Sequence, residues 1–220
     1  MEYQRLRFVA TVAVSNVDKK VRDGEIGVWL CNYVDVYYHE SIVDSLDFMS
    51  ATATRDQVSR FSLRQGDILI TKDSETPSDI AVPAQVAADM PDIVCGYHLA
   101  VVRPHGDAVS SRYLFWVLAA STSRQYFSAA AQGITRFGLR RDAILDLPVP
   151  MRDRDSQARL ATFLDEQTAR VDRLVVPDRR PSAEAAAGEI GTLVNLLRER
   201  RQALITAAVT GQLEIPGVAA

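Results

Sequence analysis

Apolar and β-branched residues gather in short runs between polar turns through the first two thirds of the chain, and this pattern predicts a sheet. We expect strands at residues 5–14, 26–38, 68–70, 80–86 and 93–102. The acidic segment 41–60 has moderate helix character, whereas the polar, proline-interrupted segment 72–79 predicts a surface loop. Within the second strand, Asn32 and Asp35 form a polar pair that we expect to bond to neighbouring backbone or turn groups.

Helical patterns follow the strands. Ser110 or Ser111 is positioned to cap a helix that reads SRYLFWVLAAS, and a second helical piece covers residues 123–131. Residues 133–141 have glycines at their turns and three arginines, which favours a shaped loop over a regular element. The segment 145–150, LDLPVP, predicts an extended, proline-marked exit from the globular part.

Beyond residue 152 the composition changes to charge-rich, helix-favouring sequence. A first apolar stripe repeats with steps of four and three at Leu160, Leu164, Gln167, Val171 and Leu174. After Pro177 and Pro181, a second amphipathic helix carries Ile190, Leu193, Leu197, Leu204 and Ala208, with Gly211 placed to end it. We expect the two helices to fold into an αα-hairpin or to pair with another chain. The pattern predicts an α+β protein with a mixed, sheet-based domain at 1–152 and a helical, coiled-coil-like region at 153–220.

Composition narrows the class of protein only a little. The chain has 220 residues, 47% of them hydrophobic, and a net charge of −3. No apolar run is long enough to cross a membrane and no signal pattern opens the chain, so we expect a cytoplasmic protein without a membrane partner. Cys31 and Cys95 are expected to be buried, unpaired thiols.

The residue patterns that enzymes of the relevant kinds require are missing. The sequence has no glycine-rich cofactor loop, no GxxxxGK[ST] phosphate loop and no Asn/Asp-Pro-Pro-aromatic motif for a flipped base. The three histidines, His39, His98 and His105, are scattered, which argues against a metal site. We therefore expect no catalytic residues, no bound metal and no cofactor, and favour a binding module.

Arginines indicate what such a module binds. Residues 111–141 contain five arginines and no acidic residue, while residues 40–92 contain ten acidic and four basic residues. Arginine is suited to phosphates and to bidentate contact with guanine edges. The alternative, a solvated arginine face with Tyr113 and Tyr126 in the core, stays open at this stage.

Six blocks of sequence carry a more specific resemblance. In order they read RQGDILITKDSETPSDIAVPA, CGYHLAVVRP, SSRYLFWVLAAS, QGITRFGLRRDAILDLPVP, QARLATFLDEQTARVDRL and LLRERRQALITAAVTGQLE. In order and spacing they resemble the specificity subunit of type I restriction-modification systems, and the resemblance runs from about Arg5 to Ile215. One departure is the proline-bearing stretch 175–190, where helices of the family usually run with little interruption.

The resemblance implies a target recognition domain at 1–152 that reads half of a split DNA sequence. It also implies that 153–220 corresponds to the family's helical spacer, which docks the methyltransferase subunit and, through it, the restriction subunit. Full-length members carry two of each region and this chain carries one of each, so we expect a homodimer on an inverted repeat in double-stranded DNA. A helix of about 25 residues spans close to 40 Å, near the ~34 Å between half-sites one DNA turn apart.

Residue roles follow from the matched blocks. DNA contact is assigned first to Arg136, Arg140 and Arg141, and then to Thr135, Phe137, Lys72, Ser74, Arg112 and Arg124. Contact with a partner helix is assigned to Leu160, Leu164, Val171, Leu193, Leu197 and Leu204, with Arg198, Glu199 and Arg201 outward or toward the methyltransferase subunit. The competing hypothesis is a protein-interaction scaffold or inhibitor of the methyltransferase complex that does not read DNA itself.

Overall fold

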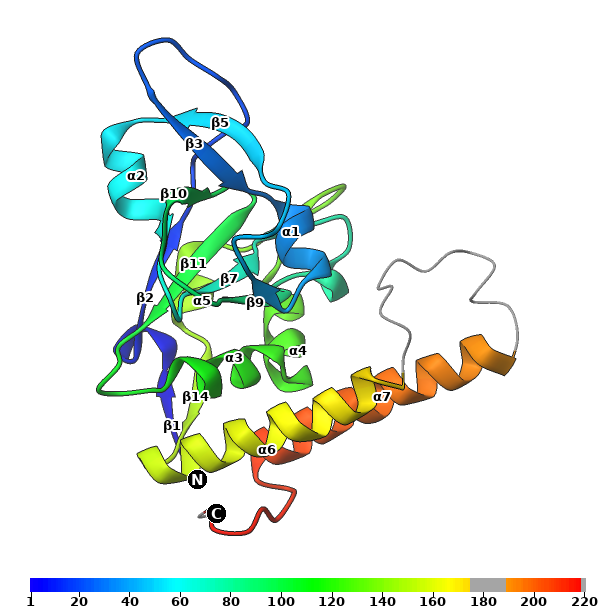
Figure 1. Cartoon of the computed structure of the whole chain (residues 1–220). Coiled ribbons are helices and arrows are strands. Elements are labelled where there is room, and N and C mark those ends of the chain that lie inside the picture. Colours follow the sequence, from blue (N-terminus) through cyan, green and yellow to red (C-terminus); the bar gives the residue numbers. More distant parts are fainter. Residues whose placement is uncertain (175–188, 219–220) are drawn as a thin grey trace.

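A five-stranded sheet runs through the middle of the molecule and separates two hydrophobic cores (Figure 1). The computed structural model describes residues 1–174 and 189–218. The strand order is β2-β11-β7-β9-β4, made of β2 (Ala10–Val14), β11 (Leu99–Pro104), β7 (Ile68–Thr71), β9 (Pro83–Val86) and β4 (Ser41–Ile42). Ile68 and Ile70 face one core and Leu69 faces the other. The continuous apolar run predicted as a strand is therefore covered on both faces.

A four-stranded sheet closes the second core. Its order is β5-β3-β10-β6, formed by β5 (Met49–Ala53), β3 (Ile26–Cys31), β10 (Met90–Cys95) and β6 (Ser62–Leu63). A turn at 96–98 separates β10 from β11, so the single strand predicted at 93–102 is two strands in two sheets. Gly96 makes this possible, since an added Cβ would lie 2.9 Å from the Cys31 carbonyl oxygen. Cys31 and Cys95 are neighbours on β3 and β10, and both are buried free thiols, as predicted.

The prediction of one strand over residues 26–38 is wrong in its second half. After β3 the chain forms the helix α1 (Tyr33–Tyr38), and the polar pair marks the change. Asn32 is the N-cap, and its backbone N–H donates to the Asp35 carboxylate at 2.7 Å. An acidic side chain three residues after a capping asparagine is a helix-start signal. The expected pairing of Asn32 and Asp35 with backbone groups is confirmed.

The acidic segment 41–60 also contains less helix than expected. It contributes β4 and β5 to the two sheets before α2 (Arg55–Phe61) begins. At the start of that helix the Thr54 side chain accepts from the Gln57 backbone N–H at 3.3 Å, and the Gln57 side chain accepts from the Thr54 backbone N–H at 2.9 Å. The predicted loop 72–79 contains the short strand β8 (Asp73–Ser74) and the 3₁₀ helix η2 (Pro77–Asp79).

Helix α3 (Ser111–Ala119) lies against the central sheet on the side of the first core, and α4 (Ser121–Ala130) packs on α3, α7 and η2. The Ser110 side chain accepts from the Tyr113 backbone N–H at 3.2 Å, which confirms the predicted cap. The Tyr113 hydroxyl donates to the Pro150 carbonyl in β14 (Pro148–Met151) at 2.7 Å. This exit strand pairs antiparallel with β1 (Glu2–Arg5). The predicted strand 5–14 is split, because the 3₁₀ helix η1 (Leu6–Phe8) separates β1 from β2.

Two long antiparallel helices, α6 (Arg154–Asp172) and α7 (Glu189–Thr210), form a helical pair across the lower side of the body in Figure 1. Gly211 ends α7 with a φ of +77°, as predicted. Pro177 and Pro181 lie outside the described residues. The change of composition near residue 152 falls between β14 and α6, but both helices contribute to the same core as α3 and α4. The division into two domains stays a prediction.

Intramolecular packing changes the roles of the predicted partner-helix residues. Leu160 and Leu164 are completely buried within the chain itself, in the core that α6 shares with α3 and α7. The chain's own αα-hairpin therefore covers these two leucines, and no second copy is needed to bury them. Leu204 is half-buried against the same core. Toward the other end of the helical pair, Leu193 remains exposed, while Val171 and Leu197 are half-buried.

An Asp165 carboxylate oxygen fastens the helical pair to the body. It accepts from Arg112 Nε at 2.7 Å and from the Trp116 indole N–H at 2.9 Å, both on α3. The Arg112 guanidinium also donates to Gln85 at 3.0 Å and lies over the Trp116 ring, 4.8 Å from its centroid. Two of the Arg112 donors are therefore directed to groups within the chain, and its assignment to DNA contact stays a prediction.

Arg201 of α7 makes a second polar contact between the helical pair and the body. Its guanidinium bonds to Glu40 at 2.5 Å and lies 3.0 Å from an Asp172 carboxylate oxygen. The side chain is only 16% exposed, so the expectation that Arg201 points outward is wrong. Gln202 and Thr206 add bonds to the Ala119 carbonyl and the Ser121 backbone N–H at 2.9 and 3.0 Å.

We predict that Asp165→Asn lowers the free energy of unfolding by about 1 kcal/mol. The change removes the charge from a carboxylate that accepts two bonds, and the effect is reduced because the side chain is 41% exposed. Urea unfolding followed by circular dichroism measures it. Glu166→Gln removes a neighbouring exposed carboxylate on the same helix and serves as the control. Equal effects of the two substitutions would contradict the assigned role of Asp165.

Candidate nucleic-acid interface

The arginine-bearing segment predicted as a shaped loop is a β-hairpin. Strands β12 (Gln132–Gly133) and β13 (Phe137–Gly138) pair around the three-residue loop 134–136, and we call residues 132–138 the 132–138 hairpin. Gly133 has a φ of +149°, and an added Cβ would lie 1.9 Å from the Arg136 carbonyl oxygen. Only glycine fits there, so the glycine that suggested a loop is what closes the hairpin.

The hairpin is attached to the body through β8. Phe137 is paired with Ser74 and Gly138 with Asp73, which makes a three-stranded sheet in the order β12-β13-β8. The structure thus brings Lys72 and Ser74 together with Thr135, Arg136 and Phe137, more than 60 positions later in the sequence. All five were assigned to DNA contact from the sequence. Thr135 and Arg136 are exposed in the hairpin loop, whereas Ser74 is buried beneath it.

His98 forms a platform under Arg136. One guanidinium nitrogen of Arg136 lies 3.3 Å from His98 Nδ1 and 3.5 Å from Nε2. A nitrogen this close to both ring nitrogens lies over the ring face, because an in-plane position would collide with Cε1. The Tyr97 ring lies against the same imidazole, with ring centroids 3.7 Å apart. Sequence reasoning treated His98 only as one of three scattered histidines and missed this role.

Asp73 holds the platform in place. Its carboxylate accepts from His98 Nδ1 and from the Lys72 ammonium, both at 2.8 Å. Burial raises the pKa of Asp73, but the hydrogen bonds from Lys72 and His98 outweigh that effect, and the pKa lies below its ordinary value. The Lys72 charge is therefore balanced within the chain, while Arg136 remains exposed in the loop.

Helix α1 packs on β7 and β9 and places Tyr33 close to Ser74, which pairs with the hairpin. The rings of Tyr33 and Tyr37 stack with centroids 5.3 Å apart, and the Tyr37 hydroxyl donates to Asp79 at 2.7 Å. The pKa of Tyr33 is raised by burial and by the charge of Asp79, while a hydrogen bond with Ser74 and the charge of Arg136 act in the opposite direction. Sequence reasoning missed these tyrosines because it read the segment as a strand. Their four-residue spacing is the helical signal that was available.

The remaining predicted DNA-contact residues are placed apart from the hairpin loop or at its base. Arg140 is exposed at the start of α5 (Arg141–Leu145). Arg141 Nε donates to the Val12 carbonyl in β2 at 2.9 Å, which ties it to the central sheet. Arg124 lies on α4 and donates to Gln202 of α7 at 3.3 Å, so it belongs to the contact between the body and the helical pair.

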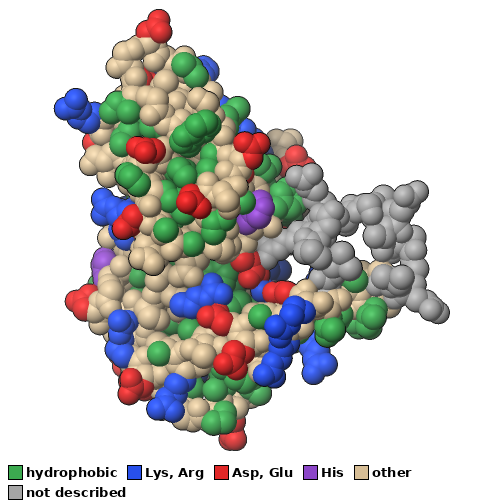
Figure 2. All heavy atoms as spheres, viewed as in Figure 1, with side chains coloured by type: hydrophobic (Ala, Val, Ile, Leu, Met, Phe, Trp, Pro, Cys, Tyr) green, Lys and Arg blue, Asp and Glu red, His purple; other side chains and the backbone are tan. Residues whose placement is uncertain are grey.

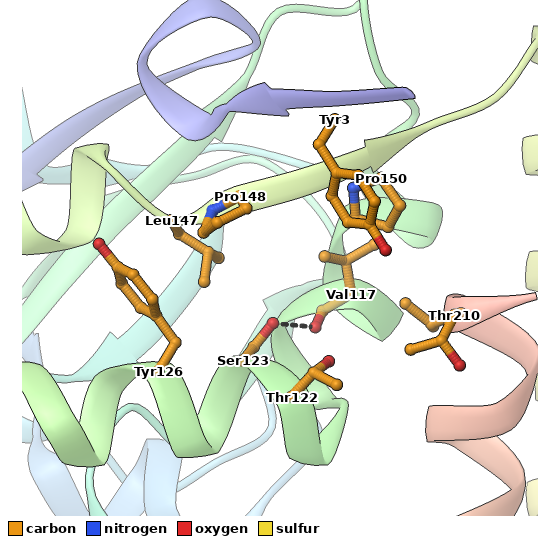
Figure 3. A pocket seen from close by; sticks show the side chains of 10 residues that line it. Tyr3, Val117, Thr122, Ser123, Tyr126, Leu147, Pro148, Pro150 and Thr210 are labelled. Carbon is orange, nitrogen blue, oxygen red and sulfur yellow. Dashed lines mark hydrogen bonds between the residues drawn. The ribbon is translucent and has the colours of Figure 1, made fainter. Parts of the chain in front are cut away.

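A pocket of about 260 Å³ lies between strands β1 and β14, helices α3 and α4, and the C-terminal end of α7. Figure 3 shows the hydroxyl of Ser123 directed to the Val117 carbonyl, a bond of 2.6 Å, and Tyr3 and Pro150 on the opposite side. The Tyr126 hydroxyl, also in the wall, donates to the Ala143 carbonyl at 3.1 Å. These polar groups are used within the chain, and among the described lining residues none is a carboxylate, histidine or cysteine.

The molecular surface separates charge and apolar groups along the helical pair. On the face shown in Figure 2, Lys and Arg side chains gather over the lower helices, and hydrophobic side chains lie open toward their projecting end. Leu174, Leu193 and Leu196 are 69%, 58% and 56% exposed, and we call them the apolar end of the helical pair. Within residues 1–174 and 189–218, no helix is long and apolar enough to span a bilayer, and no cluster of His, Cys, Asp and Glu is arranged to hold a metal.

Comparison with known proteins shows that the fold of this chain resembles that of solved structures, although its sequence matches no family model. No protein-family model matches the sequence, and no curated protein sequence matches it. One similar solved structure is a chain from the type I R-M system, solved to explain its complex assembly and conformational transition: TM-score 0.59, 16% identity, 96% of this chain covered and 46% of that chain. Another is the HsdS subunit from Thermoanaerobacter tengcongensis: TM-score 0.52, 16% identity, 96% of this chain covered and 45% of that chain.

These likenesses extend over nearly the whole chain, and at 16% identity they show a shared fold. The predicted α+β class and the resemblance drawn from the ordered sequence blocks are confirmed at that level. The chain spans just under half the length of the two solved chains, 46% and 45%.

We predict that Asp73→Asn destabilises the protein at pH 7 and that the difference from the unsubstituted chain shrinks in acid. A carboxyl whose pKa is lowered on folding stabilises the folded state above its unfolded pKa of about 3.9, and this stabilisation is lost as the pH falls through the lower folded value. After allowance for solvent screening we expect about 1 kcal/mol at pH 7. Urea unfolding at pH 7 and near pH 3 measures the difference.

Glu75→Gln, an exposed carboxyl two residues along, is the matched control and should change little at either pH. If Asp73→Asn has the same effect at both pH values, the paired carboxylate does not stabilise the platform through its charge.

Proposed function

We propose that this chain is a non-catalytic DNA-specificity subunit of a type I restriction-modification complex. Its partners would be double-stranded DNA, a methyltransferase subunit and, through it, a restriction subunit. The observation that carries the proposal is the shared fold over 96% of the chain with two specificity-related structures. The order of the sequence blocks and the projecting 132–138 hairpin support it independently.

The hairpin suits contact with the DNA major groove, which accommodates a two-stranded β-ribbon. Arg136 and Arg140 are exposed, and neither guanidinium is among those that form the described ion pairs. Arginine at the end of a ribbon can bond to a guanine edge through two donors, or to a phosphate. In our proposal these two arginines make the principal contacts, and Thr135 and Phe137 make further contacts from the same hairpin.

The apolar end of the helical pair supports a role in assembly. Leu174, Leu193 and Leu196 are all more than half exposed at one end of the helical pair, and each would contribute about 1.5–3 kcal/mol if fully buried. We propose that a second copy of the chain covers them, so that two hairpins related by a two-fold axis read an inverted repeat, one half-site per chain. The 22 residues of α7 span about 33 Å, close to the ~34 Å between half-sites one turn apart.

A second candidate function is a scaffold or inhibitor that docks on the methyltransferase subunit without reading DNA. The observation that favours it is the net charge of −3, because a DNA-binding surface benefits from positive charge. The two functions differ in what they require of the hairpin arginines, so a substitution there separates them.

We predict that Arg136→Ala combined with Arg140→Ala abolishes sequence-specific modification. Loss of two arginine contacts should weaken specific DNA binding on the order of 100-fold. The target is first identified from the methylated motifs of cells that express the chain with its methyltransferase subunit. Binding and methylation of that target by the purified complex are then compared with the unsubstituted form.

Arg55→Ala combined with Arg60→Ala, exposed on α2, removes the same charge away from the hairpin and should retain modification. A complex that methylates no motif, or one in which the Arg136/Arg140 variant modifies DNA normally, would rule out the recognition role and leave the scaffold.

We predict that Leu193→Asp with Leu196→Asp converts the dimer to a monomer without lowering the unfolding midpoint. Both side chains are more than half exposed, so the substitutions introduce charge at the assembly surface and leave the core of the chain intact. Sedimentation velocity measures the mass. Ala203→Asp, at an exposed position on the same helix where α7 lies against the body, is the control and should remain dimeric. A double variant that still sediments as a dimer contradicts this interface.

A further inference from the structure

Ile134, at the tip of the 132–138 hairpin, is 94% exposed. It is the most exposed large hydrophobic side chain among the described residues, and it contacts almost nothing in its own chain. The positive φ of this hairpin is at Gly133, so Ile134 has an ordinary backbone conformation that does not itself select isoleucine. An isoleucine at this position therefore does not stabilise the fold. Its apolar side chain is available to contact a molecule that binds to the hairpin.

We infer that Ile134 contacts the 5-methyl group of a thymine in the major groove and so helps to determine the target sequence. The inference rests on the proposed function and concerns the same surface. Thymine is the base that presents a methyl group in the major groove, and apolar side chains recognise it by contact. Two successive loop residues, Thr135 and Arg136, are exposed beside Ile134, so one tip presents an apolar, a hydroxyl and a guanidinium group.

The dimensions of the hairpin favour the major groove. Paired strands are about 4.8 Å apart between backbones, and their side chains widen the ribbon further. A minor groove about 6 Å wide is too narrow for it, whereas a major groove about 12 Å wide admits a two-stranded ribbon. Since the loop spans only residues 134–136, a hairpin that enters the groove brings Ile134 to the base edges together with Arg136.

The hairpin is also held well enough to place a single methyl contact. The backbone at Gly133 packs so closely against Arg136 that no side chain would fit. Strand β8 pairs with both residues of β13, and the Arg136 guanidinium lies against His98. Isoleucine itself has a stiff χ1, so little side-chain freedom is lost on contact. A contact made by a prearranged side chain discriminates between bases more effectively than one made by a flexible side chain.

Replacement of each thymine by deoxyuridine tests the inference, because it removes the 5-methyl group and leaves base pairing intact. The full chain with its methyltransferase subunit is titrated with duplexes that carry one such replacement at a time across the half-site. We expect one position at which the unsubstituted complex binds about fourfold more weakly, the factor expected for one lost methyl contact. Ile134→Ala should bind more weakly overall and should become indifferent to deoxyuridine at that position.

Ile134→Val, which keeps the β-branched shape, is the matched control and should retain the sensitivity. A half-site with no sensitive position, or unchanged sensitivity in Ile134→Ala, overturns the inference while the specificity role stands. The same holds if Ile134→Ala weakens only the association with the methyltransferase subunit, because the contact would then be with protein. Absence of any sequence preference in the unsubstituted complex is a separate outcome, which refutes the proposed function itself.

Discussion

The Asp165 carboxylate is the polar contact that sets the orientation of the helical pair against the body. It lies on α6 and accepts from two donors on α3, the Arg112 guanidinium and the Trp116 indole N–H. Trp116 and its neighbours are completely buried, so α3 cannot rotate to follow a helix that moves. Because α3 packs directly on the central sheet, this one carboxylate joins the orientation of the helical pair to the framework that positions the 132–138 hairpin. Arg201 adds the same constraint from α7 through Glu40, which lies just beyond α1.

Three aspartates, each buried to a different degree, accept hydrogen bonds from two side-chain donor groups. Asp67 is fully buried and holds Arg103 through two bonds of 2.7 Å, which suits a permanent element of the core. Asp73 is half-buried and joins Lys72 to His98 under the hairpin. Asp165 is the most exposed of the three. The energetic importance of such groups falls with exposure, so the core pair fixes the fold and the outer two fix the relative placement of its functional parts.

The sequence allowed prediction wherever local chemistry decides the structure. The apolar run at 68–70, the Ser110 cap and the Gly211 helix end were found because each depends on neighbouring residues alone. The reading of α1 as a strand failed because aromatic and β-branched composition outweighed the Asn32 cap. Contacts across the fold left no local signal. No residue near Arg112 in the sequence predicts its contact with Asp165, so Arg112 was assigned to DNA contact. In the same way, no residue near Arg136 predicts its contact with His98, and the His98 platform was missed.

The overall acidity of the chain bears on how it would recognise DNA. Sequence-independent attraction to phosphates depends on many cations, and a chain with a net charge of −3 cannot supply that attraction broadly. Its exposed guanidinium groups at the hairpin are few, and Lys72 below them is neutralised by Asp73. Affinity would then depend on well-placed base contacts and on the charge and DNA affinity of the partner subunits. If the chain is the DNA-specificity subunit proposed above, such a division would limit non-specific binding by the free chain, and DNA would be held tightly only by the assembled complex at its target.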